Sequence, residues 1–463
     1  MSDPPGLTES LCPYCLSRIS ARRVTENDSV FLVKTCPTHG KLDPVVLWKN
    51  SIHSYSGWTR HNNEPIDNGP VPGPSSASGC PFECGLCPDH KQGTCTAIIE
   101  VTNQCNLHCS ICFASSGTSL AANPKKEQIA RMLQSLLDRG SPCPVQFSGG
   151  EPTLRDDLPE IIALSREMGF DHVQVNTNGI RLAQDADFGK ALKDAGATVV
   201  FLQFDGLTDA VYTRIRGSAL LQTKLETIER CAELKLGVIL VPTLVKGIND
   251  NQIGSVIRFA GKWVPVVKGV HFQPMTYLGR HPETPRNEKR ILIPDILSAI
   301  EDQTLGELKV ENFIPPGCEE SHCSFSALAI LGSDGSLIPT TRFDSVRETT
   351  PCCSEEYARR SMNYVRNRWK YRESELTVLE PGPRPGSDCA CNTAPGEDLF
   401  ERIQSHSLCI SGMAFQDAWN IDLERLKRCC VHVVTTGGDL VPFCAYYMTG
   451  AHGQRLHPVQ KRD

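Results

Sequence analysis

The sequence has no long apolar run, no block of like charge and no leader-like start. No stretch approaches the ~18 consecutive apolar residues of a membrane-spanning helix, and the opening MSDPPGLTES lacks the basic and apolar regions of a signal peptide. The 47 basic and 53 acidic residues give a net charge of -6 and form no basic patch of the kind that binds nucleic acid. We therefore expect a cytoplasmic protein without a transmembrane segment or a nucleic-acid partner, whose contact with a membrane, if any, is peripheral.

Cysteine, by contrast, is abundant. The 463 residues include 22 cysteines, and many of them are separated by only a few residues. In a long chain without a secretory leader, such clusters indicate metal ligation rather than disulfide bonds, because the cytosol keeps thiols reduced. The length is sufficient for two or three domains, one of them large enough to close an α/β barrel.

Three cysteines form a CxxxCxxC motif, Cys105, Cys109 and Cys112, within residues 100–117, EVTNQCNLHCSICFASSG. A cubane 4Fe-4S cluster normally takes four cysteine ligands, so three thiolates would leave one iron open to an exogenous ligand. An apolar run over residues 97–101 precedes the motif and predicts a core strand that ends at this loop. A structural zinc site is the alternative.

Residues 1–63 carry a second metal-binding pattern, CPYC with Cys12 and Cys15 followed by CPTHG with Cys36 and His39. Tetrahedral coordination needs four ligands from two turns, so this spacing predicts a zinc-ribbon or rubredoxin-like site for one iron or zinc ion. His39 could instead be a solvated turn residue, with the fourth ligand coming from elsewhere.

Residues 64–79 are rich in proline, glycine and serine and predict a linker. Residues 80–95 follow with four cysteines, which are enough to complete a cluster without outside help. We expect an auxiliary 4Fe-4S site here, with a zinc knuckle as the alternative. The predicted ligands are Cys80, Cys84, Cys87 and Cys95.

Residues 96–308 alternate between short β-branched runs and amphipathic segments at helical spacing. Six such strand and helix pairs without interruption predict an α/β fold, a parallel sheet curled into a partial (β/α)6 barrel of the TIM type. Chemistry in such barrels takes place on the loops that leave the carboxyl ends of the strands. The predicted helices cover residues 125–140, 157–169, 184–196, 219–235, 250–262 and 291–304.

Polar and glycine-rich signals lie on those loops, at the same end of the barrel as the cysteine motif. Glycines allow close backbone approach to a cofactor, carboxamides reach ribose or carboxylate groups, and arginine pairs with a carboxylate bidentately. Glu151 could accept a hydrogen bond from an ammonium group or support its own loop, and any single member could be a turn or helix-cap residue. The candidate cofactor-binding residues are Gly149, Gly150, Glu151, Asn176, Gln203, Asp205 and Arg216.

Beyond residue 309 the alternation stops and cysteines return, so residues 309–463 predict a C-terminal cysteine-rich iron-sulfur domain. The long spacings do not determine which four cysteines meet, and Cys318 is an alternative to Cys323. Cys143 and Cys231 are more typical of buried apolar residues than of ligands. The candidate ligands of this third cluster are Cys323, Cys409, Cys429, Cys430 and Cys444.

Several of these motifs occur together in one known family. With CPYC, CPTHG, CNLHCSICFA, GGEPTL, DLERLKRCC and PFCAY, the chain resembles the tetraether synthase branch of the radical SAM superfamily, whose members were earlier described as pterin-dependent methylases. The segment LCISGMAFQDAW is similar to the bacterial Trs-type radical SAM relatives, some of which are selenoproteins. The resemblance covers nearly the whole chain.

This resemblance implies a radical SAM barrel with an N-terminal rubredoxin-like module and two or three 4Fe-4S clusters. S-adenosylmethionine would chelate the open iron beside Phe113, and its reductive cleavage would give a 5'-deoxyadenosyl radical that activates a C-H bond. Ferredoxin or flavodoxin would supply the electron. The implied outcome is carbon-carbon bond formation or C-methylation on a lipid-like or other small-molecule substrate.

Two alternatives remain open. The same chemistry could mature a peptide or modify a pterin. The competing class of protein is a non-enzymatic iron-sulfur electron carrier. Electron transfer alone, however, does not require a GGEP loop beside a cluster with an open iron. Fold-level analogy does not determine the substrate.

Overall fold

The computed structural model describes residues 6–50, 52–59, 79–83, 90–117, 122–140, 142–282, 285–332, 334–343, 370–371 and 405–457. The predicted ligands Cys84 and Cys87 lie outside these ranges, as does almost all of the predicted linker 64–79.

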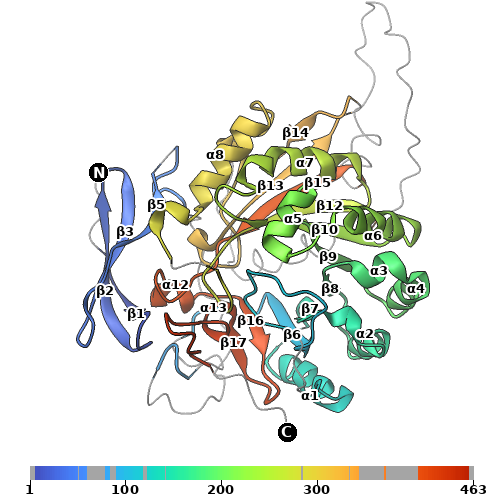
Figure 1. The fold of residues 1–463 in the computed structure, drawn as a ribbon, viewed down its shortest axis with the longest axis horizontal. Coiled ribbons are helices and arrows are strands. Elements are labelled where there is room, and N and C mark those ends of the chain that lie inside the picture. The colour runs from blue at the N-terminus through green and yellow to red at the C-terminus, as the bar shows by residue number, and fades with distance from the viewer. Residues whose placement is uncertain are drawn as a thin grey trace, which may run out of the picture.

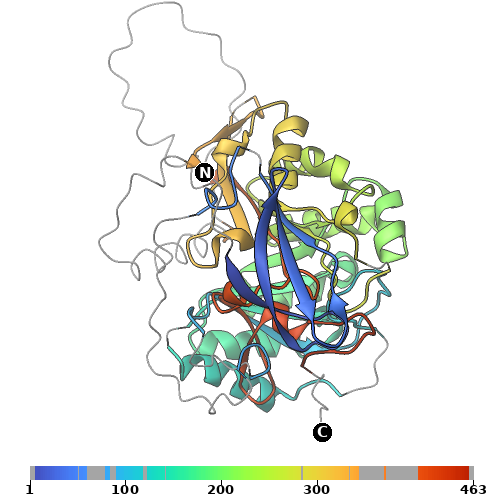
Figure 2. The same ribbon diagram turned by 90° about the vertical axis from the view of Figure 1, so that its left-hand side faces the viewer.

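The N-terminal segment forms a five-stranded antiparallel sheet in which β1, β2, β3 and β4 follow one another and β5 pairs with β3. Buried and exposed residues alternate along β3, as expected for a strand with one face against the rest of the protein. Figure 2 shows this sheet lying across the front of the barrel. Its strands are β1 (Leu7–Leu11), β2 (Arg18–Glu26), β3 (Ser29–Cys36), β4 (Gly40–Lys41) and β5 (Val45–Lys49).

The predicted barrel is confirmed, because six consecutive parallel strands are each followed by helix. The strands are β6 (Thr96–Thr102), β7 (Val145–Gly149), β8 (Val173–Thr177), β9 (Val199–Gln203), β10 (Gly237–Val241) and β12 (Val267–Pro274), with β11 (Thr243–Leu244) beside β12. The helices are α1 (Lys126–Leu137), α2 (Leu158–Glu167), α3 (Ile180–Gln184), α4 (Ala186–Asp194), α5 (Asp209–Arg216), α6 (Leu221–Glu233), α7 (Ile253–Lys262) and α8 (Ile293–Gln303).

The C-terminal part extends this sheet at both edges (Figure 1). Strand β15 lies parallel to β12 at one edge, and β16 lies parallel to β6 at the other. The elements beyond the barrel are β13 (Ser324–Leu331), β14 (Leu337–Pro339), β15 (Ser407–Met413), α12 (Leu423–Leu426), β16 (Val431–Val434), β17 (Leu440–Pro442) and α13 (Phe443–Tyr446). Strands that are distant in sequence therefore complete the wall of the barrel.

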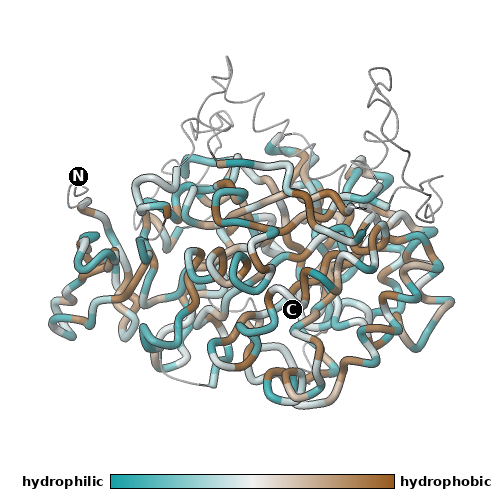
Figure 3. The backbone as a smooth tube through the Cα atoms, turned by 90° about the horizontal axis from the view of Figure 1, so that it is seen from above, coloured by the Kyte–Doolittle hydropathy of each residue, from teal (hydrophilic) through white to brown (hydrophobic). Residues whose placement is uncertain are grey.

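The main hydrophobic core lies between the sheet and its helices, and Ile129, Met132, Leu133 and Leu136 form the buried face of α1. Figure 3 shows the chain from above, with the N-terminal sheet on the left and the barrel helices on the right. Within the part of the chain that the structure describes, no helix is long and apolar enough to cross a membrane.

Candidate active site

The CxxxCxxC loop leaves the carboxyl end of β6, where barrel chemistry is expected. Arg280 holds this loop, because its backbone exchanges two hydrogen bonds of 2.9 Å with Cys112 and its Nε donates to the carbonyl of Cys109 at 2.8 Å. The Cys109 side chain is buried, and Cys105 and Cys112 pack beside it. The three predicted cluster ligands therefore lie together.

The chemistry of this donor set fits an iron-sulfur cluster. Burial raises the pKa of the Cys105 thiol to about 12, and the charges of Cys109 and Cys112 add to the shift. Three clustered, at least partly buried thiols need a nearby positive charge to become thiolates, and iron would supply it.

The glycine pair after β7 contacts the cysteine loop itself. Gly150 donates its N–H to the carbonyl of Thr102 at 2.7 Å, and Glu151 donates its N–H to the carbonyl of Gln104 at 2.8 Å. A Cβ at Gly149 would lie 2.2 Å from Thr102 O, and one at Gly150 would lie 2.0 Å from Gln104 O. The structure thus gives the glycines a packing role against residues 102–104 that the sequence did not indicate.

Glu151 is 2% exposed, and both of its carboxylate oxygens accept hydrogen bonds. Thr153 donates through its N–H at 3.1 Å and its hydroxyl at 2.7 Å, while the Thr177 hydroxyl and the Asn178 N–H each donate at 2.7 Å. The carboxylate ties the loop after β7 to the loop after β8. This geometry supports the loop-supporting alternative over direct ammonium binding.

We expect Glu151→Ala to lower the free energy of unfolding by about 3–5 kcal/mol, because it leaves several buried donors unpaired. Thermal denaturation of the variant, with Glu151→Gln as the conservative control, measures this effect. A variant with the wild-type melting temperature but weaker S-adenosylmethionine binding would show instead that Glu151 contacts the cofactor.

Arg216 and Asp205 form a buried bidentate ion pair, with two distances of 2.7 Å. The guanidinium also interacts with the Cys109 thiol and donates to the Thr243 hydroxyl at 2.9 Å. With its amide turned so that the oxygen faces Arg216, Gln203 accepts at 3.0 and 3.1 Å. These contacts use the guanidinium hydrogen bonds that the sequence analysis assigned to a cofactor carboxylate. They also place the positive charge of Arg216 beside the cysteine loop.

A cavity of about 290 Å3 opens below the cysteine loop and reaches into the barrel. Phe113 lies on its wall and makes edge contacts with Phe443 and Tyr447 of the C-terminal part. Asn176, from β8, faces the same cavity. Loop, barrel and C-terminal module therefore share one site.

Lys224 is a site residue that the sequence did not reveal. Although it belongs to α6, its ammonium group is buried and donates to the carbonyl of Asn178. Burial lowers its pKa to about 8. A lysine in an amphipathic helix is typical of a solvated face, so the sequence carried no signal for this position.

Cys95, from the predicted block Cys80 to Cys95, lies beside two cysteines from the C-terminal part of the chain. Hydrogen bonds with Cys318 and Cys430, together with burial, raise the pKa of Cys95, so these three thiols lie together. Cys95 directly precedes β6 and Cys430 directly precedes β16, and these two strands are parallel neighbours. Their pairing brings the Cys95 N–H to 2.7 Å from the Cys430 carbonyl. We call Cys95, Cys318 and Cys430 the first auxiliary triad, and Cys84 and Cys87 of the predicted block lie outside the described residues.

A second auxiliary triad consists of Cys323, Cys429 and Cys444. Burial and the charges of Cys444, Cys430 and Cys323 raise the pKa of Cys429. Arg425 donates to the Cys323 sulfur at 3.0 Å, and the Gln416 N–H donates to the Cys444 sulfur at 3.2 Å. Such donors fit a site that carries negative charge on sulfur.

Cys409 corrects another prediction. It lies in the middle of β15, opposite Leu328 of β13, five residues along that strand from Cys323. At ~3.3 Å per residue this is a separation of roughly 16 Å, too far to share a cluster.

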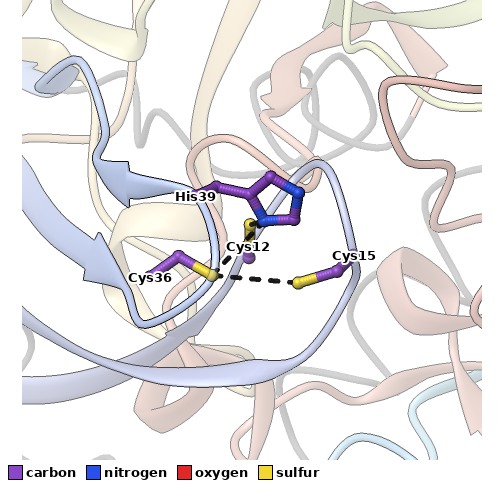
Figure 4. A group of neighbouring side chains, drawn as sticks. All are labelled: Cys12, Cys15, Cys36 and His39. Atoms are coloured by element: carbon purple, nitrogen blue, oxygen red, sulfur yellow. Dashed lines mark hydrogen bonds between the residues drawn. The ribbon is translucent and has the colours of Figure 1, made fainter.

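The N-terminal pattern meets as predicted (Figure 4). The ligand atoms of Cys12, Cys15, Cys36 and His39 all lie within 4.8 Å of one another. His39 Nδ1 lies 3.5 Å from the sulfurs of both Cys12 and Cys36, which favours its role as the fourth ligand over a solvated turn residue.

Comparisons with known proteins agree with this arrangement. Residues 99–260 match the radical SAM superfamily, and residues 4–48 match the HMPTM N-terminal zinc ribbon domain. The chain is 38% identical to a 7,8-dihydro-6-hydroxymethylpterin dimethyltransferase of Methanocaldococcus jannaschii, over 95% of this chain and 92% of that protein. It is 35% identical to a probable GTP 3',8-cyclase of Pyrococcus abyssi, over 35% of this chain and 52% of the relative.

Solved structures that match part of this chain include Streptococcus suis SuiB bound to S-adenosylmethionine, with 16% identity and a TM-score of 0.37 over 46% of this chain and 47% of that one. Methylornithine synthase has 15% identity and a TM-score of 0.36 over 46% of this chain and 64% of that one. Because the 38% identity to the dimethyltransferase runs through nearly the whole length of both proteins, this chain belongs to the radical SAM superfamily and is an enzyme.

Proposed function

We propose that this radical SAM enzyme adds carbon to an unactivated C-H position of a small molecule, and that its reaction is C-methylation of a pterin-type substrate. The identity to a named pterin dimethyltransferase over 95% of the chain is the observation that carries this proposal. The polar interior of the barrel, described below, is consistent with it.

Cys105, Cys109 and Cys112 would hold a 4Fe-4S cluster, which would supply the electron for reductive cleavage of S-adenosylmethionine to methionine and a 5'-deoxyadenosyl radical able to take a hydrogen atom from the substrate. The methyl group would come from a second S-adenosylmethionine, which would leave as S-adenosylhomocysteine, and a second electron would complete the balance. Arg280 orients their loop, Glu151 fixes the neighbouring loop, and the Arg216–Asp205 pair places a positive charge beside Cys109. Phe113 and Phe443 shield the cavity from water.

We assign an auxiliary 4Fe-4S cluster to each of the two auxiliary triads, with fourth ligands drawn from Cys80, Cys84 and Cys87. Neighbouring clusters of this kind relay electrons, and a low-potential donor such as ferredoxin or flavodoxin would supply them. The N-terminal ribbon would hold one zinc or iron ion on Cys12, Cys15, Cys36 and His39.

Carbon-carbon coupling on a lipid-like substrate is the second candidate. Part of the cavity lining favours it, because Met275, Leu278, Phe415 and Phe443 offer an apolar surface of the kind that a hydrocarbon chain would contact.

The test is anaerobic turnover of reconstituted enzyme with S-adenosylmethionine, a strong reductant and 7,8-dihydro-6-hydroxymethylpterin. We expect 5'-deoxyadenosine together with a pterin that is heavier by one or two methylene units, measured by mass spectrometry. Formation of 5'-deoxyadenosine with no change in the pterin, but with coupling of an added isoprenoid or fatty-acyl lipid, would replace the first candidate with the second.

A further inference from the structure

The barrel interior below the cysteine loop carries a pair of carboxamides. Gln146 on β7 and Gln174 on β8 are register partners on adjacent parallel strands, and both line the cavity. They are 8% and 2% exposed. Two glutamines at one level of a barrel interior are unusual, because such positions are normally filled by branched apolar side chains.

Hydrogen bonds orient one of the two glutamines and leave the other without a partner. Gln146 Nε2 donates to Asn176 Oδ1, and Asn176 Nδ2 donates to the Ser148 hydroxyl at 3.3 Å. This chain of bonds leaves Gln146 Oε1 available as an acceptor. Among the residues that the structure describes, none forms a hydrogen bond with the Gln174 carboxamide, which lines the cavity. An amide that faces a cavity in this way is available to form hydrogen bonds with a ligand there.

The opposite wall is polar as well. His271 on β12 lines the cavity, and its Nδ1 lies 3.0 Å from the Ser411 hydroxyl of β15. Burial lowers the pKa of His271 to about 4, so the imidazole is uncharged at neutral pH. Gln273 lies two residues further along β12, on the same face of the strand, and its side chain also faces the cavity.

Between these two walls the lining is apolar. Phe201 on β9 and Val241 on β10 face the cavity and pack in one small cluster. The Phe201 and His271 ring centroids lie 6.2 Å apart. The carboxylate nearest to this region on β6, Glu100, is bonded by the hydroxyls of Tyr446 and Tyr447 at 2.9 and 2.7 Å. The groups that offer hydrogen bonds to the cavity at this level are therefore neutral, and they flank an apolar surface.

We propose that Gln146 and Gln174, facing His271 and Gln273 across the barrel interior, form the substrate-recognition site for the hydrogen-bonding edge of a flat, uncharged heterocycle, with Phe201 against its face. Each carboxamide offers one donor and one acceptor, which match the adjacent C=O and N–H groups of a lactam edge. A hydrocarbon chain at this level would offer no hydrogen bond to Gln174 or to Gln146 Oε1, so the site selects against it. This proposal rests on the proposed function, because it names the substrate class of the same cavity.

The test uses Gln174→Met, which keeps the length of the side chain and removes its hydrogen bonds. Affinity for 7,8-dihydro-6-hydroxymethylpterin is measured by calorimetry on the full-length, anaerobically reconstituted enzyme. We expect binding about ten- to a hundredfold weaker than in the wild type. The melting temperature should stay the same or rise, because the substitution breaks no hydrogen bond to another described residue; a glutamine needed only for packing would lower it.

Gln134→Met is the matched control, because Gln134 lies on the exposed side of α1 and bonds only to Asp138. It should bind the pterin and form 5'-deoxyadenosine as the wild type does. Gln146→Met provides a second variant of the site, with the same expected loss.

Equal pterin affinity in Gln174→Met and Gln134→Met would overturn the proposal. Failure of the wild type to bind either this pterin or guanine, a second heterocycle with the same lactam edge, would also overturn it. These readings do not depend on turnover, so an enzyme that binds the pterin but does not methylate it would contradict only the proposed reaction.

Discussion

Replacing Cys109 by alanine is expected to abolish the reductive cleavage of S-adenosylmethionine. Cys109 is the buried member of the CxxxCxxC loop, and Arg216 and Arg280 both contact it. With two thiolates left on that loop, the cluster would lose a ligand that no other described residue replaces. We expect the loss of about four iron ions per chain and of detectable 5'-deoxyadenosine, measured by iron analysis and chromatography after anaerobic reconstitution.

Cys231→Ala is the control for this experiment. Cys231 is equally buried, but it lies in α6 within the hydrophobic core, where burial raises its thiol pKa to about 12. Its removal should cost about 1 kcal/mol of stability from the small cavity and leave the iron content unchanged. Equal 5'-deoxyadenosine formation by Cys109→Ala and Cys231→Ala would show that the loop does not hold the catalytic cluster.

Cys429→Ala and Cys430→Ala are expected to remove two different clusters, although the two residues are consecutive. Cys430 belongs to the first auxiliary triad with Cys95 and Cys318, whereas Cys429 belongs to the second with Cys323 and Cys444. Each single substitution should remove about four iron ions and the double substitution about eight. Iron and sulfide analysis with electron paramagnetic resonance of the reduced proteins would show two distinct missing signals.

Cys409→Ala is the matched control, because the sequence predicted Cys409 as a ligand of the same cluster and the structure places it in the middle of β15. It should retain all of its iron. If Cys429→Ala and Cys430→Ala removed the same signal, one cluster would be shared between the two triads. If Cys409→Ala lost iron, the assignment of the second triad would be wrong.

The sequence by itself determined the features whose evidence is local. The ribbon ligands Cys12, Cys15, Cys36 and His39 lie on the β1–β2 and β3–β4 turns of one small sheet, so their spacing already implied their meeting. The six strand and helix pairs were also predictable, because apolar periodicity is a property of each segment. The three cysteines of CxxxCxxC needed only one loop to come together.

Only the tertiary structure decided the contacts between segments that are distant in the chain. Cys95 and Cys430 meet because β16 pairs with β6, and more than three hundred residues separate these strands. Spacing along the chain predicts ligands that share a turn, but it does not predict which strand will occupy an open edge of a sheet. That pairing determines which thiols meet in the first auxiliary triad.

The same reason explains the loop after β7. The sequence indicated that Gly149 and Gly150 allow a close approach, and the structure shows that residues 102–104 make it. The sequence could not indicate that Gln146 and Gln174 face one cavity. Alternation within a strand predicts on which side of the sheet a side chain lies, but not which residues lie opposite it across the barrel. The sequence shows which functional groups each segment carries, whereas the groups that they contact depend on how the sheet closes.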